Sequence, residues 1–500
     1  MSEPRTLARL EAVVDRAAVA IRVELALPIG GRPRQLPVRT LLLGILLALA
    51  DGRPAHLTRV HHALVALPEA DQRRLQVLLD WAAGPHQLTY RQVERTYRLV
   101  VRALAKDLPN GTPSAALSQL VDALLEASVP EEHKTASSAL AIDWSDHETF
   151  SNPPAEKGGP CADDEAAWGH RRGGAPGQKH ELFYGYYLQA ATMVNEETGP
   201  PVPELARRIS LTACDHDPVR AFLPVLANLT ATGVALGDVL ADSGYAHRDA
   251  EAWALPLRQL GAALVTDLHP HDRGPKGTHA GAVISNGNLY CPATPRALLE
   301  LGPLARGASE QQTADHDRST TELSHYKLGR ITNHDADGYH RVTCPATTGK
   351  LRCPRRGESM TLGYQRPEVL TPPEPAPVCC TQRTITVPPE VTAKTAQKHD
   401  YPSRAHRASY ARRSAAERTF ATAKDPASND INRGWCRLMG LTAITVFAAC
   451  LFVVRNERIL TAYDNRQADN TRRLTAGLPP RTRRRRRRTL ADLVTAATPP

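Results

Sequence analysis

The first part of the chain carries apolar residues at helical spacing. Segments such as "RTLARLEAVVDRAAVAIRVEL" and "VRTLLLGILLALADG" repeat apolar side chains every three or four positions, which is the period of one helix face. The same spacing continues through "LTRVHHALVAL", "RRLQVLLDWAA", "RQVERTYRLVVRALAKDL" and "SAALSQLVDALLEAS". We therefore predict an all-helical N-terminal domain over residues 1–135.

The pattern changes at residue 137, where strand-like segments begin. "SSALAIDW", "ELFYGYYLQAATMV" and "ARRISLTAC" are apolar, aromatic or β-branched, as strands usually are. A helix follows in "DHDPVRAFLPVLANLTATG", with Asp217 as its N-cap and Pro218 in its first turn. "ALGDVLADSGY" then predicts a strand ending at Asp242, "HRDAEAWALPLRQLG" a helix and "AALVTDL" a strand. This order predicts an α/β fold over residues 137–269.

The periodicity fades between residues 270 and 400, where Gly, Pro, Thr and scattered cysteines dominate. We predict a β- and loop-rich insertion there, helices over 401–462, and a basic, disordered tail over 463–500. The apolar run "LTAITVFAACLFVV" at 441–454 is too short to span a bilayer and fits a buried core helix.

Composition adds a partner class and a compartment. The 500 residues have a formal net charge of +10, which favours a polyanionic partner such as nucleic acid. No secretory signal is visible, and the nine cysteines show no regular pairing, as in proteins of a reducing cytosol. We expect a cytoplasmic protein that does not interact with membranes.

One short window, "YARRSAAERTFATAK" at 410–424, groups chemically different residues on one side of a helix. On a continuous helix with about 100° per residue, its phenol, guanidinium, carboxylate and ammonium groups fall within roughly 60° of arc. These four residues are Tyr410, Arg413, Glu417 and Lys424. An acid among cations suits a site where metal and phosphate meet.

Phosphoryl transfer of this kind uses two divalent ions about 4 Å apart, held by carboxylates. Glu417 alone cannot hold them, but Asp143 and Asp242 each follow an apolar strand-like run. Strand ends that lie side by side would place these carboxylates on one edge of a sheet, with Glu417 opposite them.

The motifs resemble those of a known family. "Y-x2-R-x3-E-x6-K" is matched at 410–424, and "D-x-G-[FY]" is matched by Asp242, Gly244 and Tyr245. With these motifs the chain, over about residues 137–460, resembles the DDE transposases of bacterial insertion sequences, in the group that carries the YREK signature. Members of that family have a ribonuclease-H-like catalytic core, often with an insertion between the second Asp and the Glu.

The resemblance implies the following roles. Asp143, Asp242 and Glu417 would be catalytic and would bind two magnesium (or manganese) ions, one activating water or a DNA 3′-hydroxyl, the other stabilising the leaving oxygen. The DNA-binding residues would be Arg413 and Lys424 at phosphates, and Tyr410 at the backbone or a displaced nucleotide.

The implied protein is a transposase that cleaves double-stranded DNA at the inverted repeats of its element and joins the ends to target DNA. It would act as a homodimer on DNA, associated with the bacterial nucleoid.

Several alternatives stay open. The chain could instead be an inactive or domesticated transposase-derived DNA-binding protein, or a stand-alone DNA endonuclease. Asp146 lies near the first acid, and Asp267, which ends "LVTD", rivals the second but lacks the following Gly-Tyr. The N-terminal helices would serve DNA binding or dimerisation.

Two further features are less specific. The insertion holds five cysteines that could build a zinc site, but they include no CxxC pair, which favours unliganded thiols. They are Cys291, Cys344, Cys353, Cys379 and Cys380. The run "RTRRRRRR" at 481–488 would bind nucleic acid without reading sequence, or is simply a solvated tail.

Overall fold

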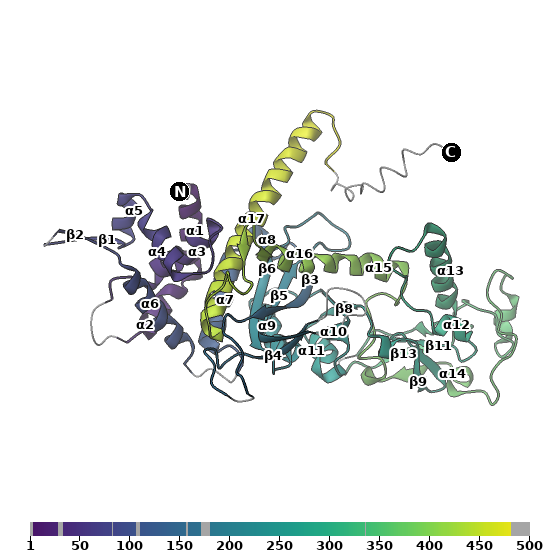
Figure 1. Cartoon of the computed structure of the whole chain (residues 1–500). Coiled ribbons are helices and arrows are strands. Elements are labelled where there is room, and N and C mark those ends of the chain that lie inside the picture. The colour runs from purple at the N-terminus through teal and green to yellow at the C-terminus, as the bar shows by residue number, and fades with distance from the viewer. Residues whose placement is uncertain are drawn as a thin grey trace, which may run out of the picture. The chain divides into compact units, whose positions relative to one another are not determined.

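The computed structural model describes residues 4–28, 34–82, 84–106, 111–156, 159–171, 181–335 and 337–481 (Figure 1). The chain divides into two compact units, Met1–Asn456 and Glu457–Pro500. The first unit takes in nearly all the regions predicted from the sequence, so the boundaries drawn between those regions stay predictions.

The N-terminal region is mainly helical, as its periodicity predicts. Its helices are α1 (Pro4–Ala17), α2 (Val19–Ala26), α3 (Val38–Ala50), α4 (Leu57–Val65), α5 (Glu69–Arg74), α6 (Tyr90–Leu104), α7 (Ala115–Ala127) and α8 (Glu131–Lys134). Helix α3 is apolar on all sides and almost wholly buried, as expected for a helix at the centre of a bundle.

The expectation of an all-helical region is wrong at residues 78–87. The segment "RRLQVLLDWAA" does not continue as a helix but forms a hairpin of β1 (Leu78–Trp81) and β2 (Gly84–Gln87). Helix α5 ends because Gln76 adopts φ 60° and the Val77 N–H donates to Gln72 O at 2.8 Å. This is a Schellman-type helix end, which the apolar spacing alone does not reveal.

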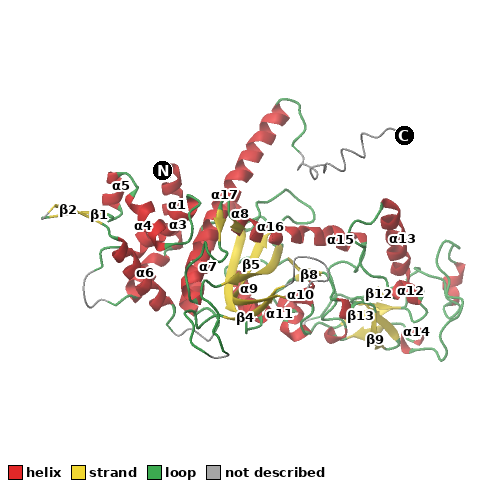
Figure 2. Cartoon of the chain, viewed as in Figure 1, coloured by secondary structure: helices red, strands yellow, loops and turns green. Residues whose placement is uncertain are grey.

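A six-stranded mixed sheet forms the centre of the first unit (Figure 2). Its strands are β3 (Leu140–Glu148), β4 (Ala167–Arg171), β5 (Glu181–Met193), β6 (Ala206–Ala213), β7 (Asp238–Ala241) and β8 (Ala263–Thr266). The strand order is β4-β5-β3-β7-β8, with β6 also paired to β5. Strand β5 runs antiparallel to its three neighbours, whereas β3, β7 and β8 are parallel.

The predicted order of strands and helices is confirmed, and so is the α/β class. Helix α9 (Pro218–Ala231) follows β6, and Asp217 caps it by accepting the Val219 N–H at 3.0 Å. Between β7 and β8 lie α10 (Ser243–Ala246), η1 (Ala250–Ala252) and α11 (Ala254–Gln259). The sequence reading missed β4, a five-residue strand beside β5.

The two faces of this sheet are covered by different helices. On one face, Tyr186, Leu188 and Ala190 of β5 belong to the same buried cluster as the apolar residues 441–454 and the N-terminal helices. The same face meets the helix that contains Glu417: Ala190 is the register partner of Asp143, and Thr192 that of Ala141, and residues of β3, β7 and β8 pack there against Ala415 and Ala416. On the other face, Gln189 of β5 donates from its Nε2 to Pro218 O of α9 at 2.7 Å. The sheet is therefore covered on both sides.

Residues 270–400 are rich in loops and short strands, as predicted, but they also contain a long helix. The elements are η2 (Pro270–Asp272), β9 (Pro275–His279), β10 (Ala282–Ser285), β11 (Asn288–Tyr290), α12 (Arg296–Leu299), α13 (Glu310–Tyr326), β12 (Gly329–Arg330), β13 (His340–Thr343), η3 (Gly357–Thr361), α14 (Val378–Thr381), β14 (Ile385–Val387) and η4 (Pro389–Val391). The sequence pattern did not predict helix α13, because it is polar and buries only Leu323 and Tyr326. A capping box between Ser309 and Gln312 starts it.

The C-terminal region returns to helix. Its elements are α15 (Arg404–Tyr410), η5 (Ala411–Arg413), α16 (Ser414–Ala423), β15 (Lys424–Asp425), β16 (Asn429–Asp430) and α17 (Leu441–Thr475). The apolar run 441–454 is a buried helix, as predicted, and the Tyr97 hydroxyl donates to Ala443 O at 2.7 Å.

The predicted disordered tail from residue 463 is wrong for residues 463–475, because α17 continues to Thr475. The segment has no Gly or Pro until Gly477, so nothing in it stops a helix. Residues 482–500, with most of the arginine run, lie outside the described residues.

The packing of α3 on α4 depends on Gly44. A Cβ there would lie 2.8 Å from Leu64 Cδ1 and 2.9 Å from Val60 Cγ1. We predict that Gly44→Val lowers the free energy of unfolding by about 1–3 kcal/mol through overpacking, measured by urea denaturation. Gly302→Val is the control, since a Cβ there meets no described atom within 4 Å. Equal midpoints for wild type and Gly44→Val would contradict this packing.

Candidate functional site: a half-buried acid pair beside an arginine

Asp143 and Asp242 lie next to each other because of the register of two parallel strands. Ala141 of β3 pairs with Leu240 of β7, and each aspartate comes two positions later in its strand direction. Residues two apart on an extended chain share a face. The two carboxylates are thus neighbours on the face that buries Ala141 and Leu240.

The prediction that both acids end a strand is half right. Asp242 follows β7 directly, whereas Asp143 lies inside β3, which continues to Glu148. Strand β3 extends further because its antiparallel partner β5 keeps pairing with it as far as Gly185. Asp143 is nevertheless where the parallel pairing with β7 has ended.

Helix α16 lies over this face of the sheet. Its Ala415 and Ala416 are fully buried against Ala141 and Leu240, and their small side chains let the helix approach the strands closely. Glu417 is the next residue and its side chain is 55% exposed. It therefore stands at the rim of the half-buried acid pair.

Arg413 connects the sheet to the helix. Its Nη1 lies 3.2 Å from Asp143 Oδ2, and its Nη2 bonds to Glu417 Oε1. The Arg413 side chain is only 13% exposed, so water screens its charge weakly. One cation thus bridges two of the three acids.

The charge of the acid pair is only partly balanced. Burial, and then the nearby charge of Asp242, raise the pKa of Asp143 to about 7, although Arg413 and the Trp144 N–H work in the opposite direction. Burial lowers the pKa of Arg413, but Tyr410 and Asp143 outweigh it, so the net pKa is raised. A buried carboxylate with such a pKa is short of positive charge.

The Asp-x-Gly-Tyr motif has a local structural reason. Asp242 caps α10 by accepting the Gly244 N–H at 2.9 Å. A Cβ on Gly244 would lie 2.7 Å from the indole of Trp144, so glycine is needed for the close approach. Tyr245 is fully buried, with its ring 4.5 Å from that of Trp144. The motif thus locks the loop that orients Asp242.

The four residues of the helical window do not share one continuous helix. Helix α15 ends at Tyr410, a 3₁₀ turn covers 411–413, and α16 begins at Ser414. The tighter turn changes the angle per residue, so the predicted stripe is only approximate. Lys424 lies beyond α16, as its C-cap.

The Tyr410 side chain packs against His406 and Arg413 and does not extend into solvent. Its ring is stacked on that of His406 at 5.8 Å, and the Arg413 guanidinium carbon lies 5.7 Å from its centroid. Burial raises the pKa of the Tyr410 phenol. In this structure the tyrosine supports the position of Arg413, which bridges the acids.

Lys424 lies beside the alternative first acid rather than beside Asp143. Its Nζ is 2.6 Å from Asp146 O and 3.2 Å from Asp146 Oδ1. Burial opposes the change, but Lys424 and Arg171 lower the pKa of Asp146. Asp146 is therefore balanced by Lys424 and Arg171, whereas Asp143 shares its one cation, Arg413, with Glu417.

The alternative second acid, Asp267, also has fixed partners. It accepts the Tyr401 hydroxyl at 2.8 Å and lies 3.2 Å from Arg273 Nη2. Asp267 comes two residues after Val265 of β8, which pairs with Leu240 of β7. It therefore holds the position after β8 that corresponds to Asp242 after β7, but its charge is balanced by Arg273.

Sequence reasoning missed the residues that anchor the helix. Arg412 Nη2 lies 2.6 Å from Asp238 Oδ2 at the start of β7, and its Nη1 bonds to Asn195 O at 3.0 Å. Lys398 bonds to the same Asp238 carboxylate at 2.8 Å. A buried acid at the first position of an apolar strand was the available signal.

The acids fit a divalent cation by their chemistry, although they are not gathered tightly. Carboxylate oxygens are the donors that Mg²⁺ and Mn²⁺ prefer, and Arg413 balances the charge of the pair Asp143–Asp242 only in part. Among the described residues, the group with all ligand atoms within 4.8 Å of one another is His247, His269 and Asp272, not these acids. Glu417 would have to leave Arg413 to join the aspartates.

Among the described residues, the cysteines of the insertion do not form such a group. Cys291, Cys344 and Cys353 pack in one apolar cluster, and Cys379 lies in another. Burial raises the pKa of Cys291 to about 12, whereas a hydrogen bond with Cys379 lowers the pKa of Cys380 to about 7. Unliganded thiols stay the prediction, with a zinc site as the alternative.

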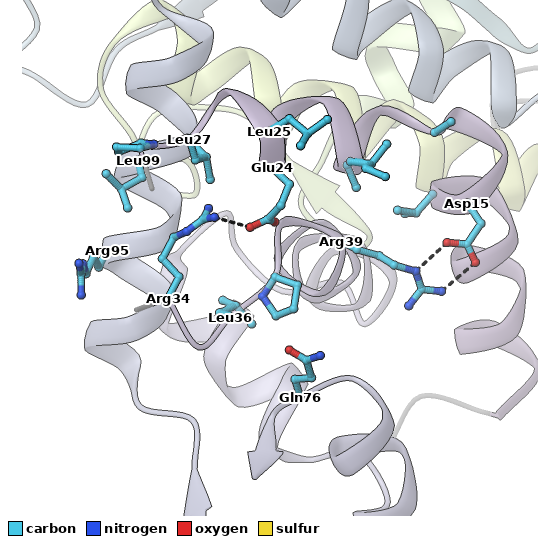
Figure 3. Close-up of a pocket in the computed structure, with 16 residues that line it drawn as sticks. Asp15, Glu24, Leu25, Leu27, Arg34, Leu36, Arg39, Gln76, Arg95 and Leu99 are labelled. Carbon is cyan, nitrogen blue, oxygen red and sulfur yellow. Dashed lines mark hydrogen bonds and ion pairs between the residues drawn. The ribbon is translucent and has the colours of Figure 1, made fainter. Parts of the chain in front are cut away.

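A cavity of about 810 Å³ lies in the N-terminal region, away from the acids. Figure 3 shows Glu24 paired with Arg34, and Asp15 with Arg39, on its walls. Its other lining is largely aliphatic. Nothing in this lining matches the predicted site.

No helix among the described residues combines the length and the apolar character needed to cross a membrane. No protein-family model matches the chain, and no curated protein matches it either.

We predict that Asp143→Asn stabilises the metal-free protein at pH 8, and does so by much less at pH 5. Because the folded pKa, about 7, exceeds the unfolded value, stability falls as the pH rises between the two. Removing the charge should restore about 2 kcal/mol, and at most ~4 kcal/mol, at pH 8. Urea denaturation with a chelator present measures this.

Asp146→Asn is the control and should behave in the opposite way. Its pKa is lowered in the fold, so its charge stabilises the protein above the unfolded pKa, and that contribution disappears as the pH falls through the folded pKa. Equal loss of stability in both variants at pH 8 would contradict the unbalanced charge at Asp143.

Proposed function

We propose that the chain is a DNA transposase of the DDE type, with a ribonuclease-H-like catalytic core. The observation that carries the proposal is the strand register that sets Asp143 beside Asp242 under the helix of Glu417. Apart from the extra strand β4, the sheet has the antiparallel strands β6, β5 and β3 followed by β7 and β8, which are parallel to β3, and this order supports the core fold. The YREK and Asp-x-Gly-Tyr motifs support the family.

Asp143, Asp242 and Glu417 would hold two divalent ions, magnesium or manganese. Bound there, the ions supply Lewis-acid stabilisation of charge on the phosphate and a more acidic bound water or hydroxyl. The remaining contributions come from the chain itself. The half-buried position of Asp143 limits its contact with bulk water, and the Gly244 N–H fixes the Asp242 carboxylate.

Arg413 would exchange partners when DNA binds. Its guanidinium now neutralises Asp143 and Glu417, and a phosphate offers the same bidentate geometry as a carboxylate. Moving to a DNA phosphate would release Glu417 toward the aspartates. Tyr410 would guide that movement, because it packs against the guanidinium.

Lys424 would contact the DNA backbone from the end of α16. Its ammonium is held by Asp146, close to the strand that contains Asp143. We propose that DNA is bound chiefly through phosphates, in keeping with the net charge of +10. A homodimer on DNA and an association with the nucleoid belong to the same proposal.

A second candidate is an inactive, transposase-derived DNA-binding protein. The observation that favours it is the hydrogen bond between Arg413 and Glu417. This bond holds Glu417 apart from Asp143 and Asp242, so the three acids do not form a tight group. Such a protein would bind the same DNA without cutting it. A stand-alone endonuclease would cut it but would not join the ends to a target.

We predict that Asp242→Asn and Glu417→Gln each reduce cleavage of DNA from the ends of the element by roughly 10²–10³-fold, the cost of losing one electrostatic stabiliser of the transition state. DNA that flanks the gene supplies the substrate, with Mg²⁺ present or absent, and a supercoiled target reveals strand joining. A gel-shift assay should show that both variants still bind DNA.

Asp267→Asn is the matched control and should keep its magnesium-dependent cleavage, because Asp267 is paired with Tyr401 and Arg273. DNA binding without cleavage by the wild type would favour the inactive binder. Cleavage without joining would favour the endonuclease. Full cleavage by Glu417→Gln would refute the three-acid mechanism.

A further inference from the structure

A second group of potential metal ligands lies on the loops that follow β7 and β8. His247 ends the short helix α10, and His269 and Asp272 belong to the turn η2 after β8. Parallel neighbours leave the sheet at the same edge, which brings these loops together. One potential ligand atom from each of the three residues lies within 4.8 Å of the other two.

The imidazoles of His247 and His269 lie close together. Their ring centroids are 4.0 Å apart, with 35° between the ring planes. An imidazole binds a metal ion through the lone pair of a ring nitrogen, and each of these rings places one nitrogen in the group of potential ligand atoms.

One oxygen of the Asp272 carboxylate has no hydrogen-bond partner among the described residues. Its Oδ1 accepts from Lys394 Nζ at 2.8 Å, whereas its Oδ2 is buried and bonds to no described residue. A buried carboxylate oxygen without a partner is costly. Lys394 therefore orients the carboxylate and leaves the second oxygen available to a cation.

We propose that His247, His269 and Asp272 bind a divalent transition-metal ion of the zinc type. Two imidazole nitrogens and one carboxylate oxygen suit zinc better than magnesium, which prefers oxygen donors alone. Three protein ligands leave room for water in the remaining position. The exposed side of His247 gives the ion access from solvent.

Binding has two local costs. The His269 Nδ1 accepts the His271 N–H at 3.3 Å, a long hydrogen bond that binding through either ring nitrogen would disrupt. The ion would also be repelled by the ammonium of Lys394, whose side chain is 30% exposed and so in contact with water. Against these costs, Asp272 Oδ2, which has no partner among the described residues, would gain one.

The site would fasten the loop that begins with Asp242 to the loop after β8. His247 comes five residues after Asp242, and Tyr245 between them is fully buried. The ion would serve as a clip beside the acid pair and need not take part in cleavage. The proposal is therefore independent of the proposed function and holds for a DNA-binding protein as well.

The test measures zinc and cobalt binding by the full-length chain. Protein freed of metal with a chelator is equilibrated with buffered Zn²⁺, and the bound zinc per chain is measured by elemental mass spectrometry. We expect the variant His247→Ala/His269→Ala to bind one zinc ion fewer than the wild type. Asp272→Asn should weaken binding of that ion by at least roughly tenfold. His325→Ala in α13 is the histidine control and should bind zinc as the wild type does.

Two further readouts separate this site from other ligands. Cobalt bound here should show visible bands that the double variant lacks, without the near-ultraviolet charge-transfer band of thiolate ligands. Asp143→Asn and Asp242→Asn should keep the zinc ion, which separates the site from the acid pair. Zinc should also raise the melting temperature of the wild type but not of the double variant.

The proposal is overturned if the wild type binds no zinc at about micromolar free concentration. It is equally overturned if the double variant binds as much zinc as the wild type with the same affinity. If the melting temperature of the double variant lies below that of the wild type even in chelator, the two substitutions have also removed packing. Asp272→Asn keeps both imidazole rings, so its zinc binding then separates the loss of ligands from the loss of packing.

Discussion

The parallel pairing of β3 with β7 is the constraint on which the candidate site depends. It brings Asp143 and Asp242 to neighbouring positions on one face of the sheet, where burial and mutual repulsion raise the pKa of Asp143 to about 7. Two neighbouring carboxylates with little access to solvent destabilise a fold unless a positive charge lies close to them. The protein supplies that charge from Arg413, on the segment that leads into α16.

The rest of the site can be understood as the means of keeping Arg413 and its helix in place. Arg412, the residue before it, bonds to Asp238 at the start of β7 and so holds the 3₁₀ turn against the sheet. Ala415 and Ala416 let α16 lie close to the strands. Glu417 then falls at the rim, bound to Arg413 and within reach of solvent. A cation that replaces Arg413 at the acids would change the partners of all three.

The sequence predicted the parts of the site that have strong local signals. The order of strands and helices followed from periodicity, and Asp242 was recognisable from Gly244 and Tyr245, which the structure explains by the contact with Trp144. Other features had no local signal. The hairpin at 78–87 depends on the backbone of Gln76, and α13 is too polar to show an apolar face. The 3₁₀ turn at 411–413 and the group around Asp272 arise from tertiary contacts, which spacing along the chain does not encode.

The account rests on the claim that Asp143 and Asp242 together attract divalent ions. Titration of Mn²⁺ into the full-length protein with DNA from the element ends, followed by electron paramagnetic resonance, tests it most directly. The account predicts that wild-type protein binds manganese that Asp143→Asn/Asp242→Asn does not bind, while His247→Ala/His269→Ala keeps it. Identical manganese binding by wild type and the double aspartate variant would contradict the account.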